Sequence, residues 1–213
     1  MSMNSTTKFD SLLFDMDGTL WDAVASYCAV WNTTIDVLCP EVPHVNYERL
    51  CSMMGKPLEE IFATFIGNAV PYDAFMKGLL DNEAVIMPRL GGVLYTGVRE
   101  TIETLSRSFK LFMVSNCTPD GLPNFLRYTA LGPFITDYIS YGDNGREKDH
   151  NIALMVSRHK LEAPLYIGDT MGDCLSSHAA GVPFAWASYG FGQGVQGQDY
   201  TLGDITDLLK IVC

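Results

Sequence analysis

Short, uninterrupted runs of apolar residues recur along this chain and constrain its fold more than any other feature. Five such runs occur, the third and fifth being weaker, at residues 11–14, 111–114, 134–139, 165–167 and 183–187. Because their apolar residues are continuous and do not alternate with polar ones, they are typical of strands buried on both faces. Between them lie segments of helix length, at 97–108, 148–160 and 171–180. Strands alternating with helices predict an α/β fold with a doubly wound, mostly parallel, Rossmann-like sheet.

The interval from residue 21 to residue 96 breaks this alternation, since it contains no convincing strand. Three segments in it have helical spacing, at 22–38, 57–66 and 72–87. We expect the last of these helices to end at Pro88. The chain is therefore predicted to have two domains, a helical cap domain at 21–96 and an α/β core domain formed by 1–20 and 97–213.

The charge balance limits the partners of the protein. The 213 residues include 14 Lys and Arg against 25 Asp and Glu, a net charge of −11. Nucleic-acid binders usually carry a basic face that neutralises phosphates, so no nucleic-acid partner is expected. An anionic small substrate would need a local cation, either a metal ion or a well-placed lysine.

The remaining composition indicates a cytoplasmic protein. The first ten residues lack the basic and then apolar layout of a signal peptide, and no stretch approaches 18 apolar residues, so no membrane contact is expected. No two cysteines form a C-x-x-C pair, and we expect all of them to be reduced. The six cysteines are Cys28, Cys39, Cys51, Cys117, Cys174 and Cys213.

Two pairs of aspartates follow apolar runs and carry the strongest chemical signal. Asp15 and Asp17 lie in the segment LLFDMDGTL at 12–20, and Asp169 and Asp173 lie in YIGDTMGD at 166–173. Carboxylates at the carboxyl ends of parallel strands face the crevice where such sheets bind ligands. A cluster of oxygen ligands without His or Cys suits Mg²⁺. The alternatives are an Asx turn for the first pair and helix N-capping for the second.

Other polar residues also follow apolar runs or begin helices. Ser115 ends a run and Asn116 follows it, although serine there is more often a simple turn residue. Lys148 begins a helical segment, where the helix dipole does not favour a basic residue, and this mismatch hints at a function. A solvated surface lysine is the alternative.

These motifs together resemble the haloacid dehalogenase-like hydrolase superfamily, and within it the phosphoglycolate phosphatase-like members with a small helical cap. Residues 15–19 are similar to the first motif of the family, D-x-D-G-T. The apolar run that ends in Ser115 is similar to the second motif. The third is Lys148, and the fourth is similar to G-D-x-x-x-D at 168–173. Many relatives have Lys-Pro at the third motif. Here Asp149 follows the lysine, and Arg146 is the alternative candidate for the basic residue of this motif.

The resemblance implies phosphoryl transfer through an aspartyl-phosphate. Asp15 would be the nucleophile and Asp17 the general acid and then base. Lys148 would offset negative charge, and Ser115 with the Asn116 backbone amide would hold phosphate oxygens. Further substrate-binding residues would be Gly18 and Thr19. Mg²⁺ would bind Asp15, the Asp17 main-chain carbonyl and Asp169, with Asp173 acting through water.

The same resemblance places substrate selection in the cap, where residues 53–57 form the candidate loop. Lys56 in this loop could bind an anionic group of the substrate, with a surface lysine as the alternative. Trp21, Tyr27 and Trp31 are expected to pack in the cap, and the glycine-containing segment 189–192 is a weak candidate for the wall of the site.

The predicted function is hydrolysis of a small-molecule phosphate ester, phosphoglycolate-like or a sugar phosphate, by a monomer or weak homodimer. A phosphomutase of the β-phosphoglucomutase type stays open, because such enzymes keep D-x-D-G-T. A protein that binds a phospho-ligand without catalysis is the alternative outside the enzymes.

Overall fold

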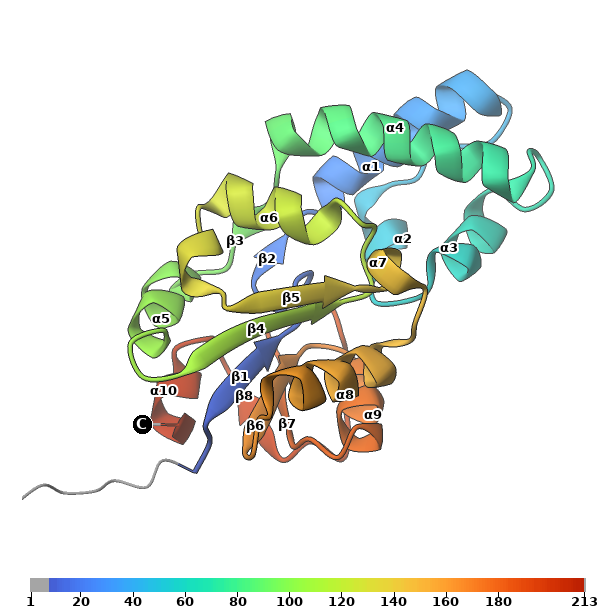
Figure 1. The fold of residues 1–213 in the computed structure, drawn as a ribbon. Coiled ribbons are helices and arrows are strands. Elements are labelled where there is room, and N and C mark those ends of the chain that lie inside the picture. The colour runs from blue at the N-terminus through green and yellow to red at the C-terminus, as the bar shows by residue number, and fades with distance from the viewer. Residues whose placement is uncertain (1–7, 213) are drawn as a thin grey trace, which may run out of the picture.

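A six-stranded sheet lies at the centre of the computed structural model, which describes residues 8–212 (Figure 1). The strand order is β5–β4–β1–β6–β7–β8, and every neighbouring pair is parallel. The strands are β1 (Ser11–Phe14), β4 (Lys110–Ser115), β5 (Asp137–Ser140), β6 (Pro164–Gly168), β7 (Phe184–Ala187) and β8 (Tyr200–Leu202). The predicted parallel α/β fold is confirmed. Cys213 lies outside the described residues.

The central strand shows why the apolar runs are continuous. Leu12 and Phe14 of β1 pack into one hydrophobic cluster, whereas Leu13 between them packs into another. All three side chains are fully buried. Because successive side chains point to opposite faces of a strand, both faces of the sheet must be covered.

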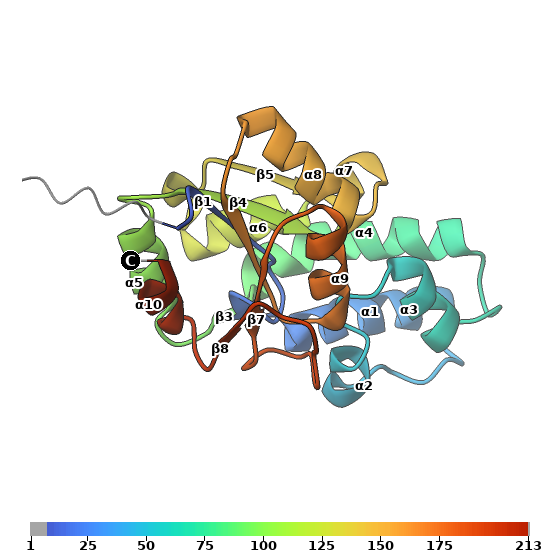
Figure 2. The same cartoon turned by 90° about the horizontal axis from the view of Figure 1, so that it is seen from below.

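Helices cover both faces, as Figures 1 and 2 show. Buried residues of α5, α6 and α10 belong to the cluster of Leu12, and those of α8 and α9 to the cluster of Leu13. The helices of this part are α5 (Val98–Leu105), α6 (Gly121–Thr129), α7 (Tyr141–Asn144), α8 (Lys148–His159), α9 (Met171–Ala179) and α10 (Asp207–Val212). The sheet is thus doubly wound.

The segment between β1 and α5 is helical, but it also contains two short strands that sequence reasoning missed. Its elements are β2 (Trp21–Asp22), α1 (Val24–Leu38), α2 (Tyr47–Cys51), α3 (Leu58–Phe65), α4 (Tyr72–Leu90) and β3 (Val93–Leu94). β2 and β3 pair antiparallel, so the two ends of this insert lie together. The prediction of an insert without strands was therefore wrong at its two ends.

The prediction that Pro88 ends the last helix of the insert was also wrong. α4 continues through Pro88 to Leu90 and ends at Gly91, which has a left-handed φ of 57°. Proline has a helical φ, but it lacks the amide hydrogen and its ring crowds the carbonyl four residues earlier. Only two residues of α4 follow Pro88, so the disturbance is confined to the last turn of the helix. Glycine adopts the positive φ that ends a helix without steric strain.

Aromatic side chains join the helices of the insert. The ring of Phe75 in α4 lies 5.3 Å from that of Trp31 in α1 and 5.5 Å from that of Phe62 in α3, measured between centroids. Trp31 therefore packs as expected. The weak run at 134–139 is split, since a 3₁₀ turn at Gly132–Phe134 precedes β5.

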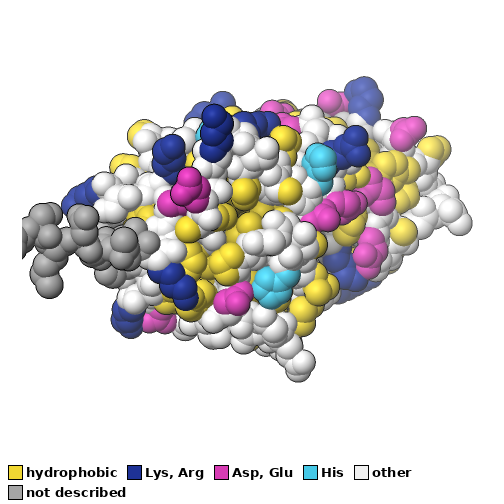
Figure 3. All heavy atoms as spheres, turned by 60° about the horizontal axis from the view of Figure 1, so that its bottom comes forward, with side chains coloured by type: hydrophobic (Ala, Val, Ile, Leu, Met, Phe, Trp, Pro, Cys, Tyr) yellow, Lys and Arg dark blue, Asp and Glu magenta, His cyan; other side chains and the backbone are white. Residues whose placement is uncertain are grey.

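The surface carries charged groups of both signs. On the face drawn in Figure 3, basic and acidic side chains are intermingled, with hydrophobic atoms between them. Within residues 8–212, no helix combines the length and the apolar character needed to cross a membrane. The five cysteines in this range are all free thiols.

Candidate active site

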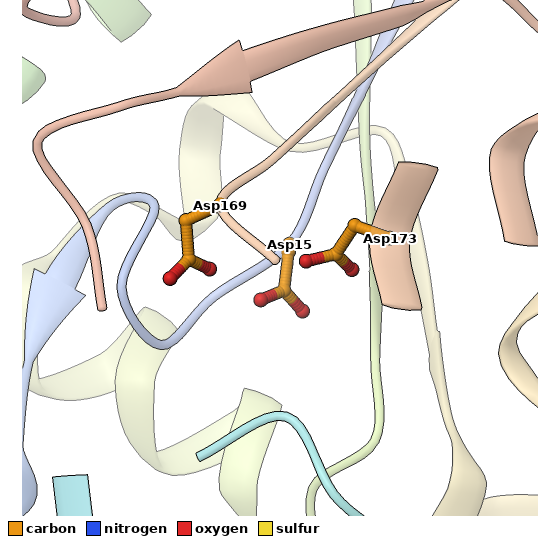
Figure 4. A group of neighbouring side chains, drawn as sticks. All are labelled: Asp15, Asp169 and Asp173. Atoms are coloured by element: carbon orange, nitrogen blue, oxygen red, sulfur yellow. The ribbon is translucent and has the colours of Figure 1, made fainter. Parts of the chain in front are cut away.

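The carboxyl ends of three neighbouring strands bring the predicted residues together. β1 lies between β4 and β6, so Asp15, Ser115 and Asp169 meet at one edge of the sheet. Figure 4 shows the side chains of Asp15, Asp169 and Asp173 converging there. Each offers a carboxylate oxygen, and the three oxygens lie within 4.8 Å of one another.

A buried lysine faces this cluster. Lys148 is the first residue of α8 and only 5% exposed, and its Nζ lies 2.9 Å from Asp15 Oδ1 and 2.6 Å from Asp173 Oδ1. Burial alone would disfavour its charge, but Asp15 and Asp173 raise the pKa of Lys148 well above its ordinary value. Arg146, the alternative candidate, is exposed.

The cluster carries more negative charge than this lysine can balance. Burial and the neighbouring Asp173 raise the pKa of Asp15 to about 6, although Lys148 opposes the shift. Burial together with the charges of Asp173 and Asp15 raises the pKa of Asp169 to about 8. Three buried carboxylates beside a single ammonium group form a donor set that fits a hard divalent cation.

Asp173 also has the helix-capping role that was the alternative for it. Its Oδ2 accepts hydrogen bonds from the Thr170 amide and hydroxyl at 2.9 and 2.7 Å, and the Asp173 amide donates to Thr170 Oγ1 at 3.1 Å. This is a capping box at the start of α9. With Oδ1 bound to Lys148, both oxygens of Asp173 already have partners.

Gly18 and Thr19 both contact Asp169. Gly18 has a φ of 82°, and a Cβ at this position would lie 2.3 Å from Asp169 Oδ2. Thr19 is fully buried, and its hydroxyl donates to Asp169 Oδ1 at 3.4 Å. Neither residue is among those that line the cavity, and their contact with substrate stays a prediction.

The segment 189–192 also contacts Asp169. The amides of Phe191 and Gly192 donate to Asp169 Oδ2 at 2.8 and 3.2 Å. A Cβ at Gly190 would lie 2.2 Å from the Gly18 carbonyl oxygen, so only glycine fits there. The segment therefore holds Asp169, and its place in the wall of the site stays a prediction.

Asp17 is held by two aromatic side chains from the insert. Trp21 Nε1 donates to its Oδ1 at 2.9 Å, and the Tyr27 hydroxyl donates to its Oδ2 at 3.2 Å. Burial and the charge of Asp15 raise the pKa of Asp17 well above its ordinary value. The expectation that Trp21 and Tyr27 only pack in the insert was therefore incomplete. No sequence spacing indicated these contacts.

A cavity of about 90 Å³ opens from the strand ends toward the insert. Asp15, Asp17, Ser115, Asn116 and Lys148 line its polar end, as do Met54, Gly55 and Lys56 of the loop. The side-chain Nδ2 of Asn116 donates to the Gly55 carbonyl at 3.4 Å, and the Oδ1 of the same side chain is buried without a partner among the described residues. Lys56 forms an ion pair with Glu60.

A doubly wound sheet with its acidic cleft at the strand ends belongs to the α/β proteins that bind ligands at this edge. The sequence model of the haloacid dehalogenase-like hydrolases matches residues 12–187. The chain therefore belongs to the haloacid dehalogenase-like hydrolase family, and it is an enzyme.

Several relatives match nearly the whole chain. A phosphoglycolate phosphatase of Vibrio parahaemolyticus is 25% identical, with 94% of this chain and 95% of the relative covered. A pyrophosphatase PpaX of Bacillus pumilus is 27% identical over 99% of both chains. Among solved structures, a predicted phosphoglycolate phosphatase from Haemophilus somnus has a TM-score of 0.85 at 19% identity, over 98% of this chain and 100% of that one. CbbY from Rhodobacter sphaeroides, in complex with phosphate, has a TM-score of 0.81 at 16% identity, over 96% and 99%.

Proposed function

We propose that the protein is a Mg²⁺-dependent phosphatase that hydrolyses a small phosphomonoester, phosphoglycolate-like or a sugar phosphate, through a phosphorylated Asp15. The observation that carries the proposal is the buried Asp15 carboxylate, which lines the cavity while Lys148 holds its Oδ1 at 2.9 Å. The names of the relatives, which include phosphoglycolate phosphatases and a pyrophosphatase, support this class of reaction.

In the first step, an oxygen of Asp15 forms a bond to phosphorus while the bond from phosphorus to the ester oxygen breaks. Asp17, whose raised pKa favours the protonated form, gives its proton to the leaving oxygen. Lys148 keeps Asp15 charged and oriented. Ser115 and the Asn116 backbone amide hold the oxygens of the phosphoryl group.

In the second step, water attacks the phosphorus of phosphorylated Asp15, and the bond between phosphorus and the carboxyl oxygen breaks. Asp17, now ionised, takes the proton of this water, which restores both aspartates. Residues of the insert line the cavity above the strand ends, and this placement would limit the access of bulk water.

The metal-binding residues in this proposal are Asp15, Asp169 and the Asp17 main-chain carbonyl, with Asp173 acting through water because both of its oxygens have partners. When bound, Mg²⁺ neutralises charge on the phosphate and the carboxylates.

The remaining assignments accompany this proposal. Residues 21–96 act as a cap domain on a core of 1–20 and 97–213, and Lys56 binds an anionic group of the substrate when it leaves Glu60. The protein works in the cytoplasm as a monomer or weak homodimer.

The test is hydrolysis of para-nitrophenyl phosphate with Mg²⁺ and with EDTA. We expect phosphate release with Mg²⁺, loss of release in EDTA and recovery when Mg²⁺ is added back. Equal release in EDTA would contradict the proposed cofactor. Absence of release with every divalent metal, together with no phosphate on Asp15 after incubation with acetyl phosphate, would overturn the proposal.

Tyr27→Phe tests the proposed role of Asp17. The change removes one hydrogen bond to Asp17 Oδ2. We expect kcat to fall about tenfold, because a single hydrogen bond to a charged group contributes roughly 1.5 kcal/mol. The binding of Mg²⁺, measured by calorimetry, should change little, since the metal would use the Asp17 carbonyl and not its carboxylate.

Tyr47→Phe is the matched control, because Tyr47 also lies in the insert and donates a hydrogen bond to an aspartate, Asp22. Tyr47 is 41% exposed and does not line the cavity. Equal losses of kcat in the two variants would contradict a specific effect of Tyr27 on Asp17.

A further inference from the structure

Glu83 is a buried acid that the proposed mechanism does not use. It lies in α4 and is only 6% exposed, and among residues 8–212 no other glutamate is buried. The buried residues of α4 are Phe75, Leu79, Glu83 and Met87, which are spaced four apart and share one helix face. A carboxyl group therefore occupies a position on this helix where its neighbours are apolar.

The protein satisfies this carboxyl only in part. The Thr118 hydroxyl donates to Glu83 Oε1 at 2.6 Å, and within the described part of the chain neither a second hydrogen bond nor an ion pair involves Glu83. Burial raises its pKa to about 7 although Thr118 acts against the shift. A buried carboxyl with so few partners is unfavourable unless another group completes its hydrogen bonding.

Glu83 faces the same cavity as the proposed nucleophile. It lines the cavity together with Asp15, Asp17 and Tyr27. The charge of Glu83 acts on Tyr27, whose hydroxyl in turn contacts Asp17, so Glu83 lies one side chain beyond the proposed acid and base. A group attached to a phosphoryl group held at Asp15 would therefore extend toward Glu83.

The cations that line the cavity already have partners. Lys148 is bound to Asp15 and Asp173, and Lys56 is bound to Glu60. Several other residues of the insert that line the cavity are apolar, among them Val30, Ile61 and Leu79. Glu83 thus offers a hydrogen-bond acceptor that is partly ionised at neutral pH, because its pKa is about 7, while Lys56 is available as a cation only after it leaves Glu60.

We propose that Glu83 determines specificity by accepting a hydrogen bond from the organic part of the substrate. Of the two substrate classes proposed above, this inference favours phosphomonoesters whose organic part carries a further hydroxyl or ammonium group, as sugar phosphates do, and it disfavours phosphoglycolate-like esters, which carry a carboxylate at that place. This inference rests on the proposed phosphatase function. A site built around a buried acceptor rejects analogues without a donor, because the acceptor is left unpaired. It rejects a carboxylate more strongly, because like charges repel.

A matched set of four two-carbon esters tests this inference: hydroxyethyl, aminoethyl and ethyl phosphate, and phosphoglycolate. Their kcat/KM values are measured for the wild type and Glu83→Gln, with para-nitrophenyl phosphate as the reference. We expect the wild type to prefer the hydroxyethyl or aminoethyl ester over the other two by about tenfold or more. Which of the two is preferred identifies the donor as a hydroxyl or an ammonium group.

Glu83→Gln retains an oxygen acceptor for Thr118 and nearly the same volume but loses the charge. We expect the ratio of aminoethyl phosphate to phosphoglycolate to fall about tenfold, while the reference ester changes less than about threefold. Asp81→Asn on the same helix is the control, because Asp81 is exposed and pairs only with Lys77. It should leave all ratios unchanged.

The outcomes separate this inference from the proposed function. No hydrolysis of the reference ester by the wild type would count against the phosphatase itself. Hydrolysis of the reference ester with ratios that Glu83→Gln leaves unchanged would overturn the role of Glu83 and indicate that its bond to Thr118 only joins the insert to the core. If the wild type hydrolyses none of the two-carbon esters, the ratios of their inhibition constants against the reference ester test the same preference at the level of binding.

Discussion

Replacing Asp15 by Asn is expected to abolish turnover while the protein stays folded. Asparagine has nearly the same shape, but its amide cannot form the acyl phosphate. We expect kcat to fall by about 10⁴-fold or more, as is usual when a nucleophile is removed. Mass spectrometry of acid-quenched enzyme should find phosphate on the Asp15 peptide of the wild type and none on that of the variant.

The stability of this variant should change little without metal. Asp15→Asn removes an ion pair with Lys148, but it also removes a charge from a crowded carboxylate cluster, and Lys148 keeps Asp173 as a partner. Thermal unfolding in EDTA should therefore give similar midpoints. The stabilisation that Mg²⁺ adds should be smaller in the variant, because one of its ligands is lost.

Asp10→Asn is the matched control, since Asp10 lies at the opposite end of the same strand. Its carboxylate accepts hydrogen bonds from the Ser11 hydroxyl and the Glu162 amide, far from the strand ends that hold the site. Full activity is expected for Asp10→Asn. Full activity of Asp15→Asn would eliminate Asp15 as the nucleophile.

Lys148→Met is expected to have the largest effect on stability. The methionine fills a similar space, but Asp15 and Asp173 then lose their buried cation. Removing one partner of a buried ion pair typically lowers the free energy of unfolding by about 3–5 kcal/mol. Urea unfolding in EDTA at neutral pH measures this loss. Mg²⁺ should restore part of it, since the ion would supply the missing positive charge.

The pH dependence of this variant follows from the sign of the pKa shifts. Although burial acts to raise it, Lys148 and Thr170 lower the pKa of Asp173 in the wild type. The ionised Asp173 therefore stabilises the wild type fully above the pKa that this group has in the unfolded chain. This stabilisation is lost as the pH falls through the lower pKa of the folded protein. Without Lys148, burial raises this pKa, so the native variant binds a proton more tightly than the unfolded chain. The difference in stability between wild type and variant should therefore narrow as the pH falls below neutral.

Lys77→Met is the control for this experiment. Lys77 pairs with Asp81 on the surface of α4, where both side chains are largely exposed. Exposed ion pairs contribute little to stability, so we expect no measurable change. Equal stability of Lys148→Met and the wild type in EDTA would show that Lys148 does not stabilise the carboxylates.

Local patterns in the sequence were sufficient for much of the architecture. Continuous apolar runs correctly predicted β1, β4 and β6, because a strand buried on both faces leaves that mark within a few residues. The helical character of the insert was predicted from helical spacing of apolar residues and the lack of such runs. Two-residue strands such as β2 and β3 leave no such mark, because their pairing joins segments about seventy residues apart.

The sequence alone also indicated which residues lie at the strand ends. Asp15, Ser115 and Asp169 follow apolar runs, and parallel strands end at one edge of a sheet, so their meeting could be predicted. The tertiary structure decided what surrounds them. It placed Tyr27 against Asp17 and Glu83 against Thr118. Such contacts join helices of the insert to loops of the core. Their geometry depends on how segments distant in sequence pack together, and the spacing of residues within one segment carries no information about that packing.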